Sequence, residues 1–122
     1  MALRVMIVDD ALFMRNMLKD IFLRAGYQVV AEAENGELAH ELYLECRPDL
    51  VTMDIVMPKK SGIEALQEIM ASDPQACVIM VSALGQDSLV LDAVESGARD
   101  FIIKPFQEDQ VIKIIRRVTG SA

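Results

Sequence analysis

The sequence has 122 residues, of which 52% are hydrophobic and 25% charged, so it predicts one globular domain, residues 1–122, and excludes a disordered chain. The 12 basic and 19 acidic residues give a net charge of −7, which disfavours binding to the phosphate backbone of nucleic acids. The most apolar stretch, Ala76 to Gly85, is about half as long as a bilayer span requires, and no secretory signal opens the chain. We therefore expect a cytoplasmic protein that binds neither nucleic acid nor membrane.

Five short apolar segments alternate with segments of helical length. These segments are Leu3–Val8, Gln28–Ala33, Leu50–Met53, Cys77–Val81 and Asp100–Ile103. The first, third and fourth are almost continuously apolar, as in strands buried on both faces of a parallel sheet. Polar Gln28 and Glu32 make the second segment an expected edge strand. The pattern predicts an α/β fold built as a doubly wound (βα)5 domain.

The helical segments have recognisable ends. Three of them are followed by a residue typical of a helix terminus, namely Gly26, Pro48 and Gly97. Ser61 and Glu64 fit a capping box, in which the hydroxyl accepts from a backbone amide and the carboxylate reaches back to the backbone. The last helix carries one apolar stripe, formed by Val111, Ile114, Ile115 and Val118.

The two cysteines, Cys46 and Cys77, lie far apart in the sequence and show no CxxC or His-containing spacing. Such a pattern indicates neither a disulfide framework nor a zinc site. We expect two free thiols.

Polar residues stand where four of the five predicted strands end. Asp9 and Asp10 follow the first strand, Asp54 the third, Ser82 the fourth and Lys104 the fifth. Because ligands of such sheets bind outside the carboxyl ends of the strands, we expect these side chains to converge. A single aspartate after a strand can simply cap a helix, but that explanation fits five such positions poorly.

Three clustered carboxylates require a cation, because unit charges 4 Å apart repel by about 4 kcal/mol at an effective dielectric near 20. Oxygen ligands without nearby His or Cys favour a hard divalent ion, and Mg²⁺ is the expected one. The ammonium of Lys104 adds a second positive charge that suits an incoming phosphoryl group. The residues therefore predict a phosphate-receiving site with a carboxylate nucleophile.

At these residues the sequence resembles the receiver domains of two-component response regulators, and among them the stand-alone chemotaxis regulators. The resemblance covers essentially the whole chain, through the segments VMIVDDALFMRNML, VTMDIVMPKKSGIEAL, VSALGQ and GARDFIIKPF. It implies a flavodoxin-like, five-stranded parallel sheet of strand order 2-1-3-4-5.

The resemblance also implies a role for each site residue. Asp54 would be the phosphoacceptor, and Mg²⁺ would be held by Asp9, Asp10, Asp54 and the backbone carbonyl of Val56. Ser82 and Lys104 would bind phosphoryl oxygens, so that the domain, though not an enzyme, assists its own phosphorylation and dephosphorylation.

Two of these positions are expected to switch conformation on phosphorylation, namely Ser82 and Phe101. Relatives often have Tyr where this chain has Phe101, so here the switch would act through ring packing without a hydroxyl. Ser82 replaces the commoner Thr, which keeps the oxygen and removes a methyl group. The Lys104–Pro105 peptide is expected to be cis.

By the same resemblance, a CheA-like sensor histidine kinase would donate the phosphoryl group, and the flagellar motor switch protein would be the target of a monomeric regulator. A separate phosphatase is a further expected partner. The target-binding face would include Leu91, Phe101 and Ile112, because Leu91 and Ile112 fall outside the apolar stripes of their helices. The alternative is a single-domain phosphorelay regulator with a different target.

Two other classes of protein share part of this pattern. A Mg²⁺-dependent phosphatase with an aspartate nucleophile would need a D-x-D arrangement after the first strand and room for a cap domain, whereas this chain has Asp9-Asp10 and is short. In a flavodoxin-like electron carrier, the same two acids would repel the flavin phosphate, and no Trp is present to stack on the ring.

Overall fold

The computed structural model describes residues 2–120, in which strands and helices alternate along the chain. The strands are β1 (Arg4–Val8), β2 (Gln28–Ala33), β3 (Leu50–Asp54), β4 (Val78–Ala83) and β5 (Asp100–Lys104). They form one parallel sheet in the order β2-β1-β3-β4-β5. Both the predicted strand order and the edge position of β2 are confirmed.

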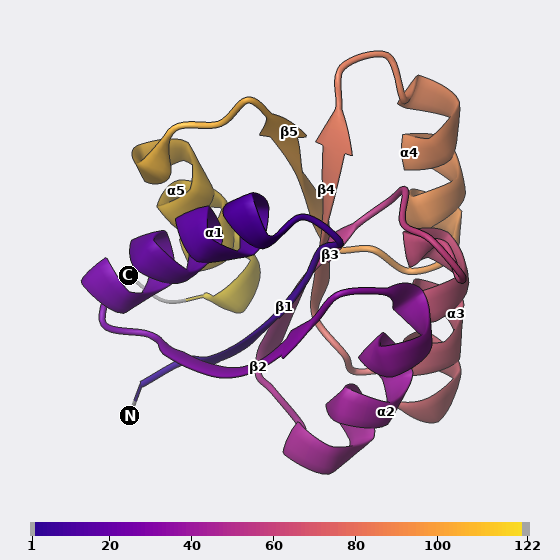
Figure 1. The fold of residues 1–122 in the computed structure, drawn as a ribbon, viewed down its shortest axis with the longest axis horizontal. Coiled ribbons are helices and arrows are strands. Elements are labelled where there is room, and N and C mark those ends of the chain that lie inside the picture. The colour runs from indigo at the N-terminus through magenta and orange to yellow at the C-terminus, as the bar shows by residue number, and fades with distance from the viewer. Residues whose placement is uncertain (1, 121–122) are drawn as a thin grey trace.

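Helices cover both faces of this sheet. They are α1 (Leu12–Arg24), α2 (Gly36–Cys46), α3 (Gly62–Ser72), α4 (Asp87–Glu95) and α5 (Glu108–Thr119). Figure 1 shows α1 and α5 together on one face and α2, α3 and α4 on the other. Each face has its own apolar core, one around Ile7, Phe22 and Ile115 and the other around Met53 and Leu66. This double coverage explains the continuously apolar central strands.

The helix ends follow the predicted signals with one exception. Gly26 and Gly97 have φ angles of 84° and 109° after α1 and α4, conformations that glycine adopts without steric cost. The Ser61 hydroxyl accepts a hydrogen bond from the Glu64 amide at 3.2 Å and so caps α3. The Glu64 carboxylate accepts from that hydroxyl at 3.3 Å instead of reaching the backbone, so only half of the predicted capping box forms.

Three strands extend further than the apolar segments predict. Asp54, Ser82 and Lys104 lie within the last two residues of β3, β4 and β5, rather than after them. The ladder continues through the pairs Asp54–Val81, Ser82–Ile103 and Ala83–Lys104. Strand pairing uses backbone groups, so a polar side chain at the end of a strand does not interrupt it. The strand ends thereby hold three of the predicted site residues in fixed directions.

Two exclusions made from the sequence can be compared with the structure. Cys46 and Cys77 are free thiols, as predicted. Between residues 2 and 120, no helix combines the length and the apolar character that crossing a membrane demands.

Candidate functional site

An acidic pocket lies where β1 and β3 end. Asp9, Asp10 and Asp54 each place one carboxylate oxygen within 4.8 Å of the others. The strand register explains this. Val8 of β1 pairs with Met53 of β3, and the residues that follow them are Asp9 and Asp54. Asp9 and Asp54 are buried, with 1% and 8% of their surface exposed, whereas Asp10 is exposed. The predicted convergence of the three acids is therefore present.

Lys104 provides the positive charge of this pocket. Its Nζ atom lies 3.5 Å from Oδ2 of Asp9 and 3.4 Å from Oδ2 of Asp54. Lys104 ends β5, and β4 lies between β5 and β3, so the long side chain reaches past one strand to the acids. The Lys104–Pro105 peptide is cis, as expected.

One lysine does not offset the burial of Asp54 among other acids. Burial, followed by the negative charge of Asp9, raises the pKa of Asp54 to about 6, although Lys104 acts in the opposite direction. A carboxyl group with this pKa is largely ionised at neutral pH. Asp54 is therefore in the form that a nucleophile requires, and its negative charge is stabilised less well than it is in water.

This raised pKa gives the metal-free protein a predictable pH dependence. Between pH 3.8, the ordinary pKa, and about pH 6, native Asp54 holds a proton that the unfolded chain has lost. The stabilisation from Asp54 is therefore present below pH 3.8 and is lost as the pH rises through 6. We expect Asp54→Asn to raise the free energy of unfolding at pH 7.5 by about 2 kcal/mol and to have much less effect at pH 4.5.

Urea unfolding of both proteins in EDTA at the two pH values measures this difference. Because the other ionisable groups are the same in the two proteins, the change in the difference between them reports Asp54. A stabilisation by Asn that is equal at both pH values would contradict the assigned cause.

The donor set of the pocket suits a small, hard cation. The three acids offer only oxygen ligands. Oδ2 of Asp9 is buried without a hydrogen-bond partner, since its contact with Lys104 has the distance of an ion pair only. Mg²⁺ binds oxygen at about 2.1 Å, so its ligands lie up to about 4.2 Å apart, close to the spread of the three acids. Within residues 2–120 the carbonyl of Val56 accepts no backbone hydrogen bond, which leaves it free to act as a further ligand.

Ser82 and Phe101 lie on the other side of the sheet from α1 and α5. Alternation along β4 places Ser82 on the same face as Met80, which belongs with Phe101 to the core under α3 and α4. Ser82 is fully buried, and its hydroxyl has no hydrogen-bond partner within residues 2–120. Phe101 is half-buried. A polar atom at the strand end and an aromatic ring thus share one face, as a switch pair requires.

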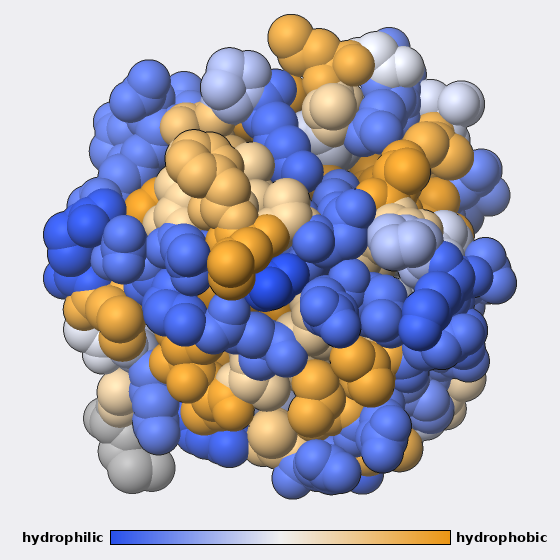
Figure 2. Space-filling view, in the orientation of Figure 1, coloured by the Kyte–Doolittle hydropathy of each residue, from blue (hydrophilic) through white to orange (hydrophobic). Residues whose placement is uncertain are grey.

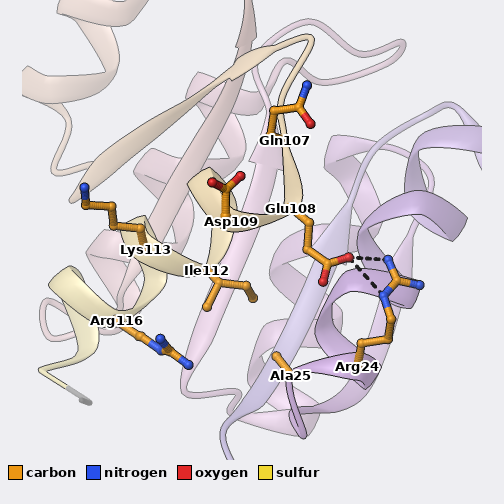
Figure 3. A pocket seen from close by; sticks show the side chains of 8 residues that line it. All are labelled: Arg24, Ala25, Gln107, Glu108, Asp109, Ile112, Lys113 and Arg116. Carbon is orange, nitrogen blue, oxygen red and sulfur yellow. Dashed lines mark hydrogen bonds and ion pairs between the residues drawn. The ribbon is translucent and has the colours of Figure 1, made fainter.

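The three residues of the predicted target-binding face lie on different parts of the surface. Leu91 on α4 is 65% exposed, and Phe101 lines a groove of about 450 Å³ between β5 and α5, together with Ile114. Ile112 instead lies in a different groove, of about 740 Å³, between α1 and α5, where Arg24 pairs with Glu108 (Figure 3). Ile112 and Ile114 line different grooves because two residues along a helix turn the side chain by about 200°. A shared target-binding role for Leu91, Phe101 and Ile112 stays a prediction.

Exposed apolar side chains stand in the segments that follow β1, β3 and β4, close in sequence to the acids and to Ser82. They are Leu12, Phe13, Val56 and Leu84, with exposed fractions between 54% and 78%. Leu12 and Phe13 open α1, Val56 follows β3, and Leu84 follows β4. Figure 2 shows the apolar surface over the start of α1 and at the tip of the loop after β4. Side chains of this kind around a polar pocket are typical of a protein-binding surface.

Sequence reasoning missed two residues that shape the pocket. A Cβ atom on Gly62 would lie 2.0 Å from the backbone oxygen of Asp54, so only glycine allows α3 to begin this close to the end of β3. A glycine directly after the cap residue of a helix was the available signal. The second residue, Arg15, donates to the backbone oxygen of Asp9, and its position in the first turn of a helix gave no indication of this.

Comparison with known proteins agrees with this geometry. The family model for the response regulator receiver domain matches residues 5–116. The chain is 59% identical to the chemotaxis protein CheY of Bacillus subtilis, over 96% of this chain and 98% of the relative. It is 54% identical to CheY of Thermotoga maritima, over 98% and 99% of the two chains.

A solved structure shares both the fold and the sequence pattern. The crystal structure of a CheX–CheY complex of Borrelia burgdorferi with BeF3 and Mg²⁺ contains a chain that matches with a TM-score of 0.91 and 41% identity, over 95% of this chain and 88% of that one. The family match, the relatives at more than half identity and the acidic pocket with its lysine lead to one conclusion. The chain belongs to the response regulator receiver domain family and is a phosphorylation-dependent signalling switch like the CheY proteins.

Proposed function

We propose that this protein, acting as one receiver domain over residues 1–122 in the cytoplasm, takes a phosphoryl group from a CheA-like histidine kinase onto Asp54. The observation that carries the proposal is the buried Asp54 carboxylate, which lies between two other acids and the Lys104 ammonium 3.4 Å away. Asp54 combines a raised pKa with close neighbours of both charges.

The transfer follows from the chemistry of these side chains. An oxygen of Asp54 forms a bond to phosphorus while the bond from phosphorus to the histidine nitrogen breaks, and that nitrogen keeps the electron pair. Lys104 and the Ser82 hydroxyl bind phosphoryl oxygens, which would give the buried Ser82 Oγ its missing partner. Asp9, Asp10, Asp54 and the Val56 carbonyl would hold Mg²⁺, which would supply positive charge for the phosphoryl oxygens.

The switch follows from the position of Ser82. A new hydrogen bond to the phosphoryl group draws the end of β4 toward Asp54 and changes the space beside Phe101, which packs on the same face. The ring, without a hydroxyl, then moves by packing alone. The face of α4, β5 and α5 around Leu91 and Phe101 is the surface that would then bind the flagellar motor switch protein, with a different target of a phosphorelay regulator as the alternative.

The apolar residues around the pocket are the proposed docking surface for the kinase and for a separate phosphatase, both of which must reach Asp54. The Borrelia burgdorferi relative is found in a complex with CheX, BeF3 and Mg²⁺, which supports the idea that a second protein binds such a chain in its activated form. We propose that the protein itself is a monomer.

A pull-down with immobilised protein, with and without BeF3 and Mg²⁺, tests the proposed output. We expect the motor switch protein to be retained only when BeF3 is present, and retention of a different protein would identify the phosphorelay alternative. Equal retention of the same proteins by the activated protein and by its Asp54→Asn variant would contradict a phosphorylation-dependent output.

The target-binding face can be tested by one charge substitution. We expect Leu91→Glu to weaken binding of the BeF3-activated protein to the motor switch protein by at least about tenfold, because a carboxylate would have to be buried at an apolar contact. Titration calorimetry measures the affinity. Leu44→Glu on α2, at a site of similar chemistry that is 41% exposed, is the matched control. Loss of binding in both variants, or in neither, would reject this surface.

A further inference from the structure

Two hydrogen bonds donated by backbone amides fix the end of β1 around Asp9. The Asp9 amide donates to the Ala33 carbonyl at 3.0 Å, across to the end of β2. The Ala11 amide donates to Oδ1 of Asp9 at 2.9 Å. With Oδ1 held in this way, Oδ2 is the oxygen that faces Lys104 and the pocket. These bonds leave the backbone carbonyl of Asp9 to be satisfied by another group.

That group is the guanidinium of Arg15. Its Nη1 atom donates to the Asp9 carbonyl at 2.7 Å, and its Nε atom lies 3.5 Å from Oε1 of Glu32 on β2. Lys19, one turn further along α1, pairs with the other oxygen of Glu32. The Arg15 side chain is only 13% exposed, against 35% for Lys19. Arg15 is therefore the member of this network that joins α1, β2 and the chain segment carrying the acids.

Two effects of Arg15 on a cation in the pocket have opposite signs. Its positive charge repels Mg²⁺, so by Coulomb interaction alone its removal should tighten Mg²⁺ binding. The hydrogen bond from Arg15 to the Asp9 carbonyl holds the backbone between Asp9 and Asp10, whose carboxylates must face the same ion. By geometry, removal of Arg15 should therefore weaken Mg²⁺ binding. Lys19 carries the same charge and contacts the same glutamate, and no contact joins it to Asp9 within residues 2–120. Lys19 is therefore a matched control for the charge of Arg15.

We propose that Arg15 is a positioning residue for the metal ligands: it fixes the Asp9 backbone so that the Asp9 and Asp10 carboxylates face Asp54. It acts through Asp9 and does not touch the metal or the phosphoryl group. Glu32 holds the guanidinium in place from β2. This inference rests on the proposed role of the acidic cluster as the Mg²⁺ site.

Titration calorimetry of metal-free protein with MgCl2 at pH 7.5 gives the decisive comparison. We expect Arg15→Met to raise the dissociation constant for Mg²⁺ about tenfold, and Lys19→Met to leave it unchanged or to lower it. Arg15→Lys, which restores a charged donor without the fork that spans Asp9 and Glu32, should fall between Arg15→Met and the wild-type protein. If Arg15→Met binds Mg²⁺ as tightly as Lys19→Met does, the inference is wrong.

Amide hydrogen exchange in metal-free protein tests the hydrogen bond between Arg15 and the Asp9 carbonyl without Mg²⁺. We expect the amides of Asp10 and Ala11 to exchange several times faster in Arg15→Met than in Lys19→Met, with both variants checked for folding by circular dichroism. Unchanged exchange at these amides would also overturn the inference. If the wild-type protein binds no Mg²⁺ while exchange changes as expected, the proposed metal site is refuted. The conclusion that Arg15 fixes the Asp9 backbone would then still hold.

Discussion

Incubated with Mg²⁺ and a small phosphodonor such as acetyl phosphate, the protein is expected to gain the mass of one phosphoryl group, and Asp54→Asn is expected to gain none. The amide of Asn cannot replace the ionised carboxylate as a nucleophile toward phosphorus. Labelling should therefore fall from near completion to below detection. Intact-mass spectrometry measures both outcomes in one experiment.

The controls separate the acceptor from the pocket around it. Asp49→Asn changes a carboxylate at the opposite end of β3, where Asp49 accepts from the Arg4 amide at 2.9 Å, and should leave labelling intact. Lys104→Met should slow labelling without moving it to another residue, because the nucleophile is kept while one charge contact to the phosphoryl group is lost. Phosphate found on another residue of the Asp54→Asn protein would refute the assignment.

The fold could be predicted from the sequence because its signals are local and agree with one another. Apolar runs without polar interruption, such as the segment at Cys77, predicted buried strands, and glycines such as Gly26 and Gly97 lie at helix ends with positive φ. The sheet order is not a local property. It came from the resemblance to a family and not from periodicity.

The core of the site was predictable for the same reason, and its surroundings were not. Asp9, Asp54 and Lys104 follow directly from strand ends in a parallel sheet, which meet at one edge. Helical periodicity shows that a residue such as Ile112 lies off the buried stripe, but it does not say which neighbouring element that side faces. In the structure it faces α1, and Ile114 lies toward β5 instead.

Contacts to the backbone were the least visible feature in the sequence. Arg15 binds a carbonyl oxygen six residues earlier, and Gly62 is required by the proximity of another carbonyl, that of Asp54. Neither partner is a side chain, so no pairing of residue types in the sequence could have indicated them. Both contacts shape the pocket at the ends of β1 and β3, where small displacements change the distances between the acids.

The lifetime of the phosphorylated state should depend on two apolar residues beside the acceptor. Hydrolysis of an acyl phosphate needs a water placed in line behind phosphorus. Val56 lies two residues after Asp54, and Leu84 lies two residues after Ser82. Both are exposed, with fractions of 54% and 78%, and neither side chain can donate or accept a hydrogen bond. They can exclude a water molecule from the approach to phosphorus, but they cannot orient one.

We therefore expect slow loss of the phosphoryl group from the wild-type protein and faster loss from the double variant Val56→Asn, Leu84→Glu. A hydrogen bond worth about 1 kcal/mol to the attacking water corresponds to about fivefold faster decay. The decay is followed by intact mass after the phosphodonor is removed, and Leu44→Glu serves as a surface control. If the double variant is folded, binds Mg²⁺ and decays no faster than the wild-type protein, the loop backbone sets the rate instead of these side chains. Slow decay of the wild type would mean that ending the signal depends on the separate phosphatase or on return of the phosphoryl group.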